Sequence, residues 1–165
     1  MGLGLEIYEK YDKLVRWKLM EYVYPAGGRG AVSKWRLKDV AIGLPQAFMD
    51  KFLKDLVKRT VWKPPDIEAL TGKKYSGLSE LRWRCGRPHR IIGYASRLPD
   101  NDRPLGERHG IFVMLIGCKH DGKKYYPTES LDTAVKRKKE IDDRKAAIDE
   151  YRLPFDSGTE GPKVP

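Results

Sequence analysis

The chain has 165 residues, which is enough for one domain with a single modest core. Its 33 Lys and Arg against 23 Asp and Glu give a formal net charge of +10, which favours nucleic acid, a ribosome or an acidic protein as partner over a basic surface with no dedicated partner. No apolar run approaches the roughly 20 residues that span a bilayer, and the first residues lack the pattern of a signal peptide. We therefore expect a cytoplasmic protein with no membrane partner.

The two cysteines, Cys85 and Cys118, lie in apolar segments. We expect small core residues or free thiols rather than a disulfide, which suits a reducing compartment. No C-x-x-C pair or histidine cluster completes a metal site, so we expect no metal and no cofactor. The chain also lacks the P-loop, H-E-x-x-H and G-x-S-x-G motifs, which excludes most nucleotide-hydrolase and serine-hydrolase functions.

The first half of the chain is predicted as one strand among helices. Apolar residues at weak helical spacing mark a helix at 3–14, and the aromatic-rich segment 17–25 is typical of a strand. Residues 31–40 fit a short helix. Residues 45–60 fit a longer one, with proline in its first turn and basic residues near its end. The apolar stripe of this longer helix consists of Phe48, Phe52, Leu53, Leu56 and Val57.

The second half is predicted as three strands and a helix. A connector with at most one helical turn leads to the strands, and the third strand is apolar without alternation, which indicates a central strand buried on both faces. A long polar loop at 97–110 precedes this strand, and Thr128 is the expected N-cap of a basic helix after it. The connector covers 66–77, and the strands cover about 78–85, 89–96 and 110–118.

This order of elements indicates an α+β fold. Hairpin connections predict a small sheet of about four strands, antiparallel or mixed at an edge, with the helices packed on one face. We expect one domain at 15–150, preceded by a helical extension at 1–14. A disordered tail rich in Pro, Gly and polar residues is expected at 151–165.

Several motifs in this order resemble a known family. The segments GLSELRW, HRIIGY and FVMLIGCKH are followed by P-x-x-x-x-x-x-A-x-x-R, which begins at Pro127 and ends at Arg137. Together they are similar to the RelE/HigB superfamily of toxin–antitoxin toxins, and most of all to its phage-related HigB-like branch. The similarity covers about 17–142 and is strongest over 77–137. The chain departs from the family pattern in its Lys119-His120 turn and its longer loops.

The resemblance implies a RelE-like fold and one of two activities. Most members of the superfamily are ribosome-dependent endoribonucleases that cut mRNA, whereas the ParE-like branch inhibits DNA gyrase and cuts nothing. We expect the first activity, with mRNA, the ribosome and a small DNA-binding antitoxin as partners. The alternative is a non-catalytic toxin or regulator of the same fold that binds nucleic acid or protein.

The expected catalytic residues supply proton transfer and positive charge. RNA cleavage by 2′-hydroxyl attack needs a base, an acid and cations around the phosphate. His120 is the candidate for proton transfer, and by family position Arg90 and Lys119 would hold the phosphate. Either Tyr125 or Tyr126 would stack on a base while the other packs in the core, and we assign the stacking to Tyr126.

The expected RNA contacts and the alternatives involve neighbouring charges. Glu80 could serve as a base or form an ion pair with Arg90, which would then be a surface arginine rather than a phosphate ligand. His120 could equally be a solvent-facing loop residue. The candidates for RNA binding are Arg82, Arg87, Lys123 and Lys124.

Overall fold

A computed structural model describes residues 16–24, 29–34, 46–59, 62, 64–82, 89–96 and 109–153. The predicted helix at 3–14 lies outside the described residues, as do most of the 97–110 loop, the second half of the 31–40 helix and the tail from 154 onward.

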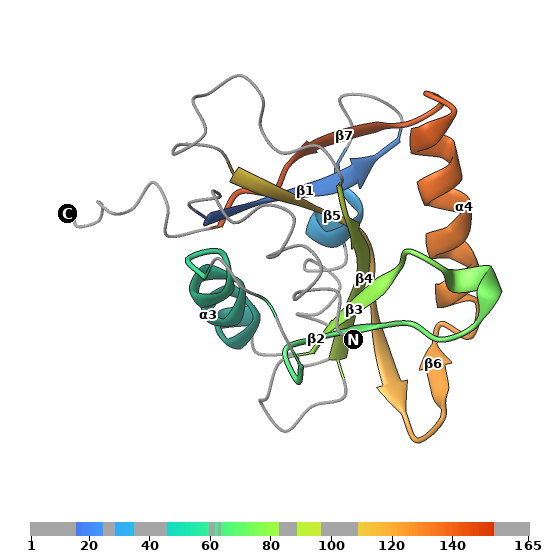
Figure 1. The fold of residues 1–165 in the computed structure, drawn as a ribbon, viewed down its shortest axis with the longest axis horizontal. Coiled ribbons are helices and arrows are strands. Elements are labelled where there is room, and N and C mark those ends of the chain that lie inside the picture. Colours follow the sequence, from blue (N-terminus) through green and yellow to red (C-terminus); the bar gives the residue numbers. More distant parts are fainter. Residues whose placement is uncertain are drawn as a thin grey trace.

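The described residues form an α+β fold around one mixed seven-stranded sheet (Figure 1). The strand order is β2-β3-β4-β5-β1-β7, and β6 pairs with β5 beside this path. The strands are β1 (Arg16–Val23), β2 (Ile67–Ala69), β3 (Ser79–Arg82), β4 (His89–Ala95), β5 (His109–Asp121), β6 (Lys124–Tyr126) and β7 (Ala147–Glu150). The helices are α3 (Gln46–Leu56), α4 (Ser130–Asp142) and the 3-10 turn Lys73–Tyr75, and residues 31–34 are also helical.

The sheet is larger than the four strands expected, and its parallel pair lies in the interior. β1 runs parallel to β5 and antiparallel to β7, so it is not an edge strand. The strands β2, β6 and β7 escape prediction, since they have only three or four residues. The central position predicted for β5 is confirmed, since the four residues from Phe112 to Leu115 are all at most 1% exposed.

The two helices cover opposite faces of the sheet, so the prediction of helices on one face is wrong. Figure 1 shows α3 and α4 on either side of the strands. A sheet whose central strand is apolar on both faces needs cover on both. α3 packs on one core, of Trp17, Leu19, Trp62, Leu81, Ile91, Phe112 and Met114. α4 packs on the other, of Tyr22, Leu78, Ile92, Val113, Leu115 and Cys118.

A bulge in β5 decides which side chains of its second half face α4. The register with β4 steps from Ile92↔Ile116 to Gly93↔Met114, so one extra residue of β5 sits opposite β4. Such an insertion shifts the alternation of side chains between the two faces. Val113 and Leu115 pack on the α4 side before the bulge, and Cys118 does so after it. His120, two residues beyond Cys118, therefore shares the α4 face.

The domain extends a little beyond its predicted C-terminal boundary. Tyr151 and Leu153 are buried against the α3-side core, and the Tyr151 N–H donates to the Leu19 carbonyl at 2.9 Å. The polar composition from 151 onward predicts a disordered tail, and for residues 151–153 that prediction is wrong. β7 holds these residues in place through its pairing with β1.

Candidate functional site on the α4 face

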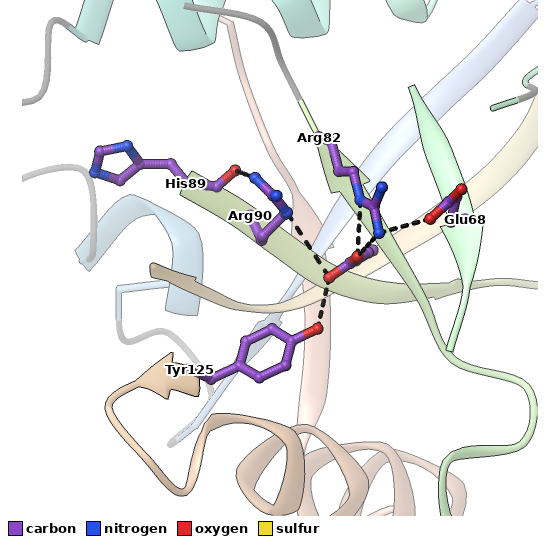
Figure 2. Close-up of polar contacts among 6 residues, drawn as sticks. Glu68, Arg82, His89, Arg90 and Tyr125 are labelled. Carbon is purple, nitrogen blue, oxygen red and sulfur yellow. Dashed lines mark hydrogen bonds and ion pairs between the residues drawn. The ribbon is translucent and has the colours of Figure 1, made fainter. Parts of the chain in front are cut away.

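Side chains from five strands, β2 to β6, meet on the α4 face of the sheet, around the carboxylate of Glu80. Figure 2 shows Glu68, Arg82, Arg90 and Tyr125 converging there. The register explains the meeting, because Arg82 lies opposite Arg90 and His120 lies opposite Tyr125. We call this group the Glu80 cluster, and it consists of Glu68, Glu80, Arg82, Arg90, Cys118, His120 and Tyr125.

Glu80 is a buried carboxylate that accepts from several donors. The residue is 3% exposed. Arg82 donates to its Oε2 from Nε at 2.8 Å and from Nη2 at 2.5 Å, and the Tyr125 hydroxyl donates to its Oε1 at 2.7 Å. These donors replace the water that burial removes and keep the carboxylate in one position.

The two arginines of the cluster differ in their surroundings. Arg82 bridges two carboxylates, since its Nη2 also lies 2.5 Å from Glu68 Oε1. Arg90 is more buried, with its Nε 3.9 Å from Glu80 Oε1 and its Nη1 donating to the His89 carbonyl at 2.9 Å. The ion pair between Glu80 and Arg90, one of the alternatives that the sequence allows, is therefore present, although it is long.

Charge within the cluster is balanced, which alters the role expected of Arg82. Arg82 lies against Glu68 and Glu80 at short range, and Arg90 faces Glu80 across a longer distance of 3.9 Å. A guanidinium already engaged by two carboxylates has little attraction left for a phosphate. Arg82 is thus a structural partner of Glu80, and its role as an RNA ligand stays a prediction.

Tyr125 connects the buried carboxylate to the histidine. Its ring lies 4.5 Å from the His120 ring, centre to centre, at an interplanar angle of 46°. Burial raises the pKa of the Tyr125 phenol well above its usual range, and the hydrogen bond to Glu80 raises it further. The phenol therefore stays protonated at neutral pH, and one face of the half-buried His120 ring is held by an aromatic neighbour.

Cys118 lies under this group as a free thiol. It is 1% exposed, and burial followed by the charge of Glu80 raises its pKa to about 12. A thiol in that state is not a nucleophile at neutral pH. The prediction of a small core residue is confirmed for Cys118, and Cys85 lies outside the described residues.

The structure separates the predicted catalytic residues into two groups. His120 and Arg90 are on the α4 face with Tyr125, whereas Lys119 lies opposite His89 in β4 and opposite Tyr126 in β6. Adjacent residues of a strand point to opposite faces, so Lys119 and Tyr126 face away from the cluster. Between the two tyrosines, Tyr125 takes part in the site and Tyr126 is 45% exposed on the other face.

The remaining predicted RNA contacts lie at the tip of the β5–β6 hairpin. Lys123 and Lys124 are exposed there beside Gly122, whose φ of 64° is the left-handed conformation that glycine adopts at little cost. Arg87 lies outside the described residues. The hairpin thus presents two exposed cations beyond Tyr125, and Lys124 shares the face of Tyr126 rather than that of the cluster.

The central place of Glu80 is the feature that sequence reasoning missed. The signal was the Leu-x-Glu-Leu-Arg pattern in β3, which places Glu80 and Arg82 on one face two residues apart. The pattern carries no sign of the contact with Tyr125, which is 45 residues away in the chain.

The described ranges hold neither a metal cluster nor a membrane span. No group of three His, Cys, Asp or Glu side chains there could hold a metal ion. No helix in the same part of the chain is long and apolar enough to cross a membrane.

No protein-family model, curated protein or solved structure matches the chain. The resemblance to the RelE/HigB superfamily therefore stays a prediction from the motifs, and the chemistry of the Glu80 cluster becomes the basis for a functional proposal.

Proposed function

We propose that this protein is a metal-independent endoribonuclease, the toxin component of a cytoplasmic toxin–antitoxin system. The observation that carries the proposal is the connected row of His120, Tyr125, Glu80 and Arg90 on one face of the sheet. It supplies an imidazole, a phenol that stays protonated and a cation, within one network.

The proposed reaction is an attack of a ribose 2′-hydroxyl on the adjacent phosphate. The bond from the 2′-oxygen to phosphorus forms while the bond from phosphorus to the 5′-oxygen breaks. The 2′-proton leaves to a base and the 5′-oxygen receives a proton, giving a 2′,3′-cyclic phosphate and a 5′-hydroxyl. His120 is the residue of the cluster suited to exchange a proton, and Arg90 is suited to stabilise the negative phosphorane.

Glu80 and Tyr125 act in this proposal as positioning residues. Glu80 already accepts hydrogen bonds from Arg82 and Tyr125, which makes it a poor base. Its role is to hold the phenol of Tyr125 and to place a negative charge 3.9 Å from the Arg90 guanidinium, and the phenol in turn orients the His120 ring. Tyr125 thus takes the place in the site that the sequence predicts for Tyr126.

The proposed substrate is mRNA, in the decoding site of the ribosome, and the proposed partner is an antitoxin. Lys123 and Lys124 are exposed at the end of the β5–β6 hairpin, where their ammonium groups are available to contact a phosphate backbone. An acidic antitoxin segment that covers the same hairpin would neutralise these charges.

The test is RNA cleavage by the purified protein, with and without ribosomes, followed by mapping of the new 5′ ends. We expect His120→Ala and Arg90→Ala each to lower the cleavage rate by at least about 100-fold, the usual contribution of a general acid or base. Lys119→Ala is the matched control on the opposite face and should cleave within about threefold of the parent. Equal activity of the His120 variant and the parent protein would falsify the assignment.

A non-catalytic binder is the second candidate, and the charge balance of the cluster favours it. Arg82 and Arg90 are both within reach of carboxylates, while exposed lysines lie on the hairpin. In that case growth arrest would survive His120→Ala and be lost in Lys123→Glu/Lys124→Glu. Stalled replication with intact RNA would then identify the gyrase-inhibitor type of activity.

A further inference from the structure

A recess lies beside α4, at the edge of β5 that pairs with β1 and β6. It encloses about 460 Å³, within the range of pockets that hold small organic ligands. Its walls come from the end of β1, residues 29–34, the middle of β5 and the first turns of α4. The polar and aromatic side chains that line it include Tyr22, Tyr24, Arg29, Lys34, Glu129 and Arg137.

The recess occupies a break in the sheet. β1 pairs with β5 up to Met114, and β6 pairs with the same edge of β5 only from Lys119. Between them the described strands leave that edge of β5 uncovered. Arg137 reaches into the break from α4, and its Nη1 donates to the Leu115 carbonyl at 2.7 Å. The opening therefore results from the strand pairing, because neither β1 nor β6 covers this stretch of β5.

The charge around the recess is positive. Three cationic residues, Arg29, Lys34 and Arg137, line it against one carboxylate, Glu129. Within the described ranges neither Arg29 nor Lys34 forms an ion pair, and both are exposed. Such a site attracts an anion of one or two charges.

The cationic wall is held firmly by the protein. Helical residues 31–34 are anchored by the buried Glu21, whose Oε1 accepts from the N–H groups of Val32 and Ser33 at 2.9 Å each. The Ser33 hydroxyl donates to the other carboxylate oxygen at 2.6 Å. Lys34 follows directly, so its backbone position is fixed relative to β1.

Two tyrosines add aromatic surface to the positively charged lining of the recess. Tyr22 forms a wall, with its hydroxyl donating to Glu140 at 2.8 Å and the Arg137 guanidinium 5.0 Å from its ring centre. Tyr24 is 56% exposed, one of the large side chains that the described residues leave most open. An exposed ring beside cations is the combination that binds a base and its phosphate.

We infer that this recess binds a nucleoside monophosphate unit, with Tyr24 stacking on the base and Arg29 and Lys34 holding the phosphate. Arg137 closes the inner wall. The unit can be a free nucleotide or one nucleotide of a single-stranded RNA, since the two share this chemistry. The inference does not depend on RNA cleavage, because the recess lies at the edge of β5 that pairs with β1 and β6, whereas Glu80 and Arg90 lie on β3 and β4, beyond the opposite edge.

The test is calorimetric titration of the full chain with each of the four nucleoside 5′-monophosphates, with inorganic phosphate and with a hexanucleotide RNA. We expect at least one mononucleotide or the hexamer to bind, and Arg29→Glu/Lys34→Glu and Tyr24→Ala each to weaken this binding by at least tenfold. Lys51→Glu/Lys58→Glu makes the same change in net charge on and just after α3, on the other side of the sheet, and should change affinity by less than threefold.

The outcomes are separable from those of the cleavage experiment. Binding of the mononucleotide assigns a free-nucleotide site, and binding of the hexamer alone assigns an RNA subsite. The inference is overturned if neither binds, if inorganic phosphate binds as tightly as the nucleotides, or if the α3 control weakens binding as much as the recess variants. The recess variants leave His120 and Arg90 unchanged. The effect of His120→Ala or Arg90→Ala on cleavage therefore has no bearing on the nucleotide-binding result.

Discussion

The two faces of the sheet are filled in contrasting ways. The α3 side is built mainly from aromatic and aliphatic side chains, in which Trp62 packs 4.6 Å from Trp17 and 5.4 Å from Phe112, centre to centre, although Asp50 and His89 are also buried there. The α4 side has an apolar centre too, but buried or half-buried polar groups flank it, with Glu80 and Arg90 on β3 and β4, Tyr125 reaching Glu80 from β6, and Arg137 on α4. One face contributes stability, and the other holds the polar networks that chemistry or recognition needs.

The contrast has an energetic meaning. Apolar burial on the α3 side stabilises the fold directly. Buried polar groups on the α4 side roughly offset their own desolvation and become costly only when one partner is removed. Substitutions on the two faces should therefore separate stability from activity.

The largest effect is expected from Leu53→Ala, in the α3-side core. Leu53 is fully buried, and truncating such a side chain leaves a cavity that costs about 2–5 kcal/mol. Urea denaturation measures the loss, with the exposed Lys51→Ala as control at less than about 0.5 kcal/mol. RNA cleavage per folded molecule should not change. A folded variant with much reduced cleavage would contradict the claim that the α3 side contributes to stability and not to activity.

The next effect is expected from removing Glu80. Glu80→Ala leaves Arg82 and Tyr125 without their shared acceptor and should lower the free energy of unfolding by about 3 kcal/mol, as for a broken buried ion pair. Glu68→Ala removes the other carboxylate that Arg82 contacts. Because the Glu68 side chain is 41% exposed, this change should lower the free energy of unfolding by less than about 1 kcal/mol. Similar losses in the two variants, measured by urea denaturation, would show that burial of Glu80 is not what makes it important.

The smallest effect is expected from Tyr125→Phe, and it depends on pH. At pH 8 the lost hydrogen bond to Glu80 should cost about 1–2 kcal/mol. An unfolded tyrosine titrates near pH 10, and the pKa of Tyr125 in the folded protein is raised by burial and Glu80. The contribution of the protonated phenol to the free energy of unfolding is thus fully present below about pH 10, and it is lost progressively as the pH rises above that value.

The difference between parent and Tyr125→Phe should consequently shrink between pH 8 and pH 10.5, measured by urea denaturation at both. Tyr126→Phe, whose ring is on the other face, serves as the control and should show no such change. A difference that grows with pH would mean that the phenol is not held in its protonated form.

The sequence predicts the elements that are long and strongly patterned. The helix around Leu53 and Leu56 is recognisable because its apolar residues recur at helical spacing. The strand from Phe112 to Leu115 is recognisable because its apolar residues are consecutive, and all of these residues are buried. The basic helix α4 is recognisable too, although it begins at Ser130 rather than immediately after Thr128. The short strand β7 carries no such pattern, because its residues are mostly exposed.

The site is less predictable than the fold, for a geometric reason. A strand pattern says that Lys119 and His120 point to opposite faces but not which face carries the function. That choice is made by the bulge near Gly93, where a Cβ atom would lie 2.2 Å from the Val113 carbonyl oxygen. Glycine there permits the close backbone approach, and the resulting shift brings His120 and Cys118 to the α4 side.

The place of β1 in the sheet has a consequence for synthesis of the chain. Its partners in β5 and β7 lie roughly ninety or more residues later in the sequence, so β1 has nothing to pair with until most of the chain has left the ribosome. Trp17, Leu19 and Val23, all buried in the finished fold, remain exposed during that time. Assembly is therefore late and slow, as expected for contacts between distant segments, and the nascent chain is a natural client for chaperones.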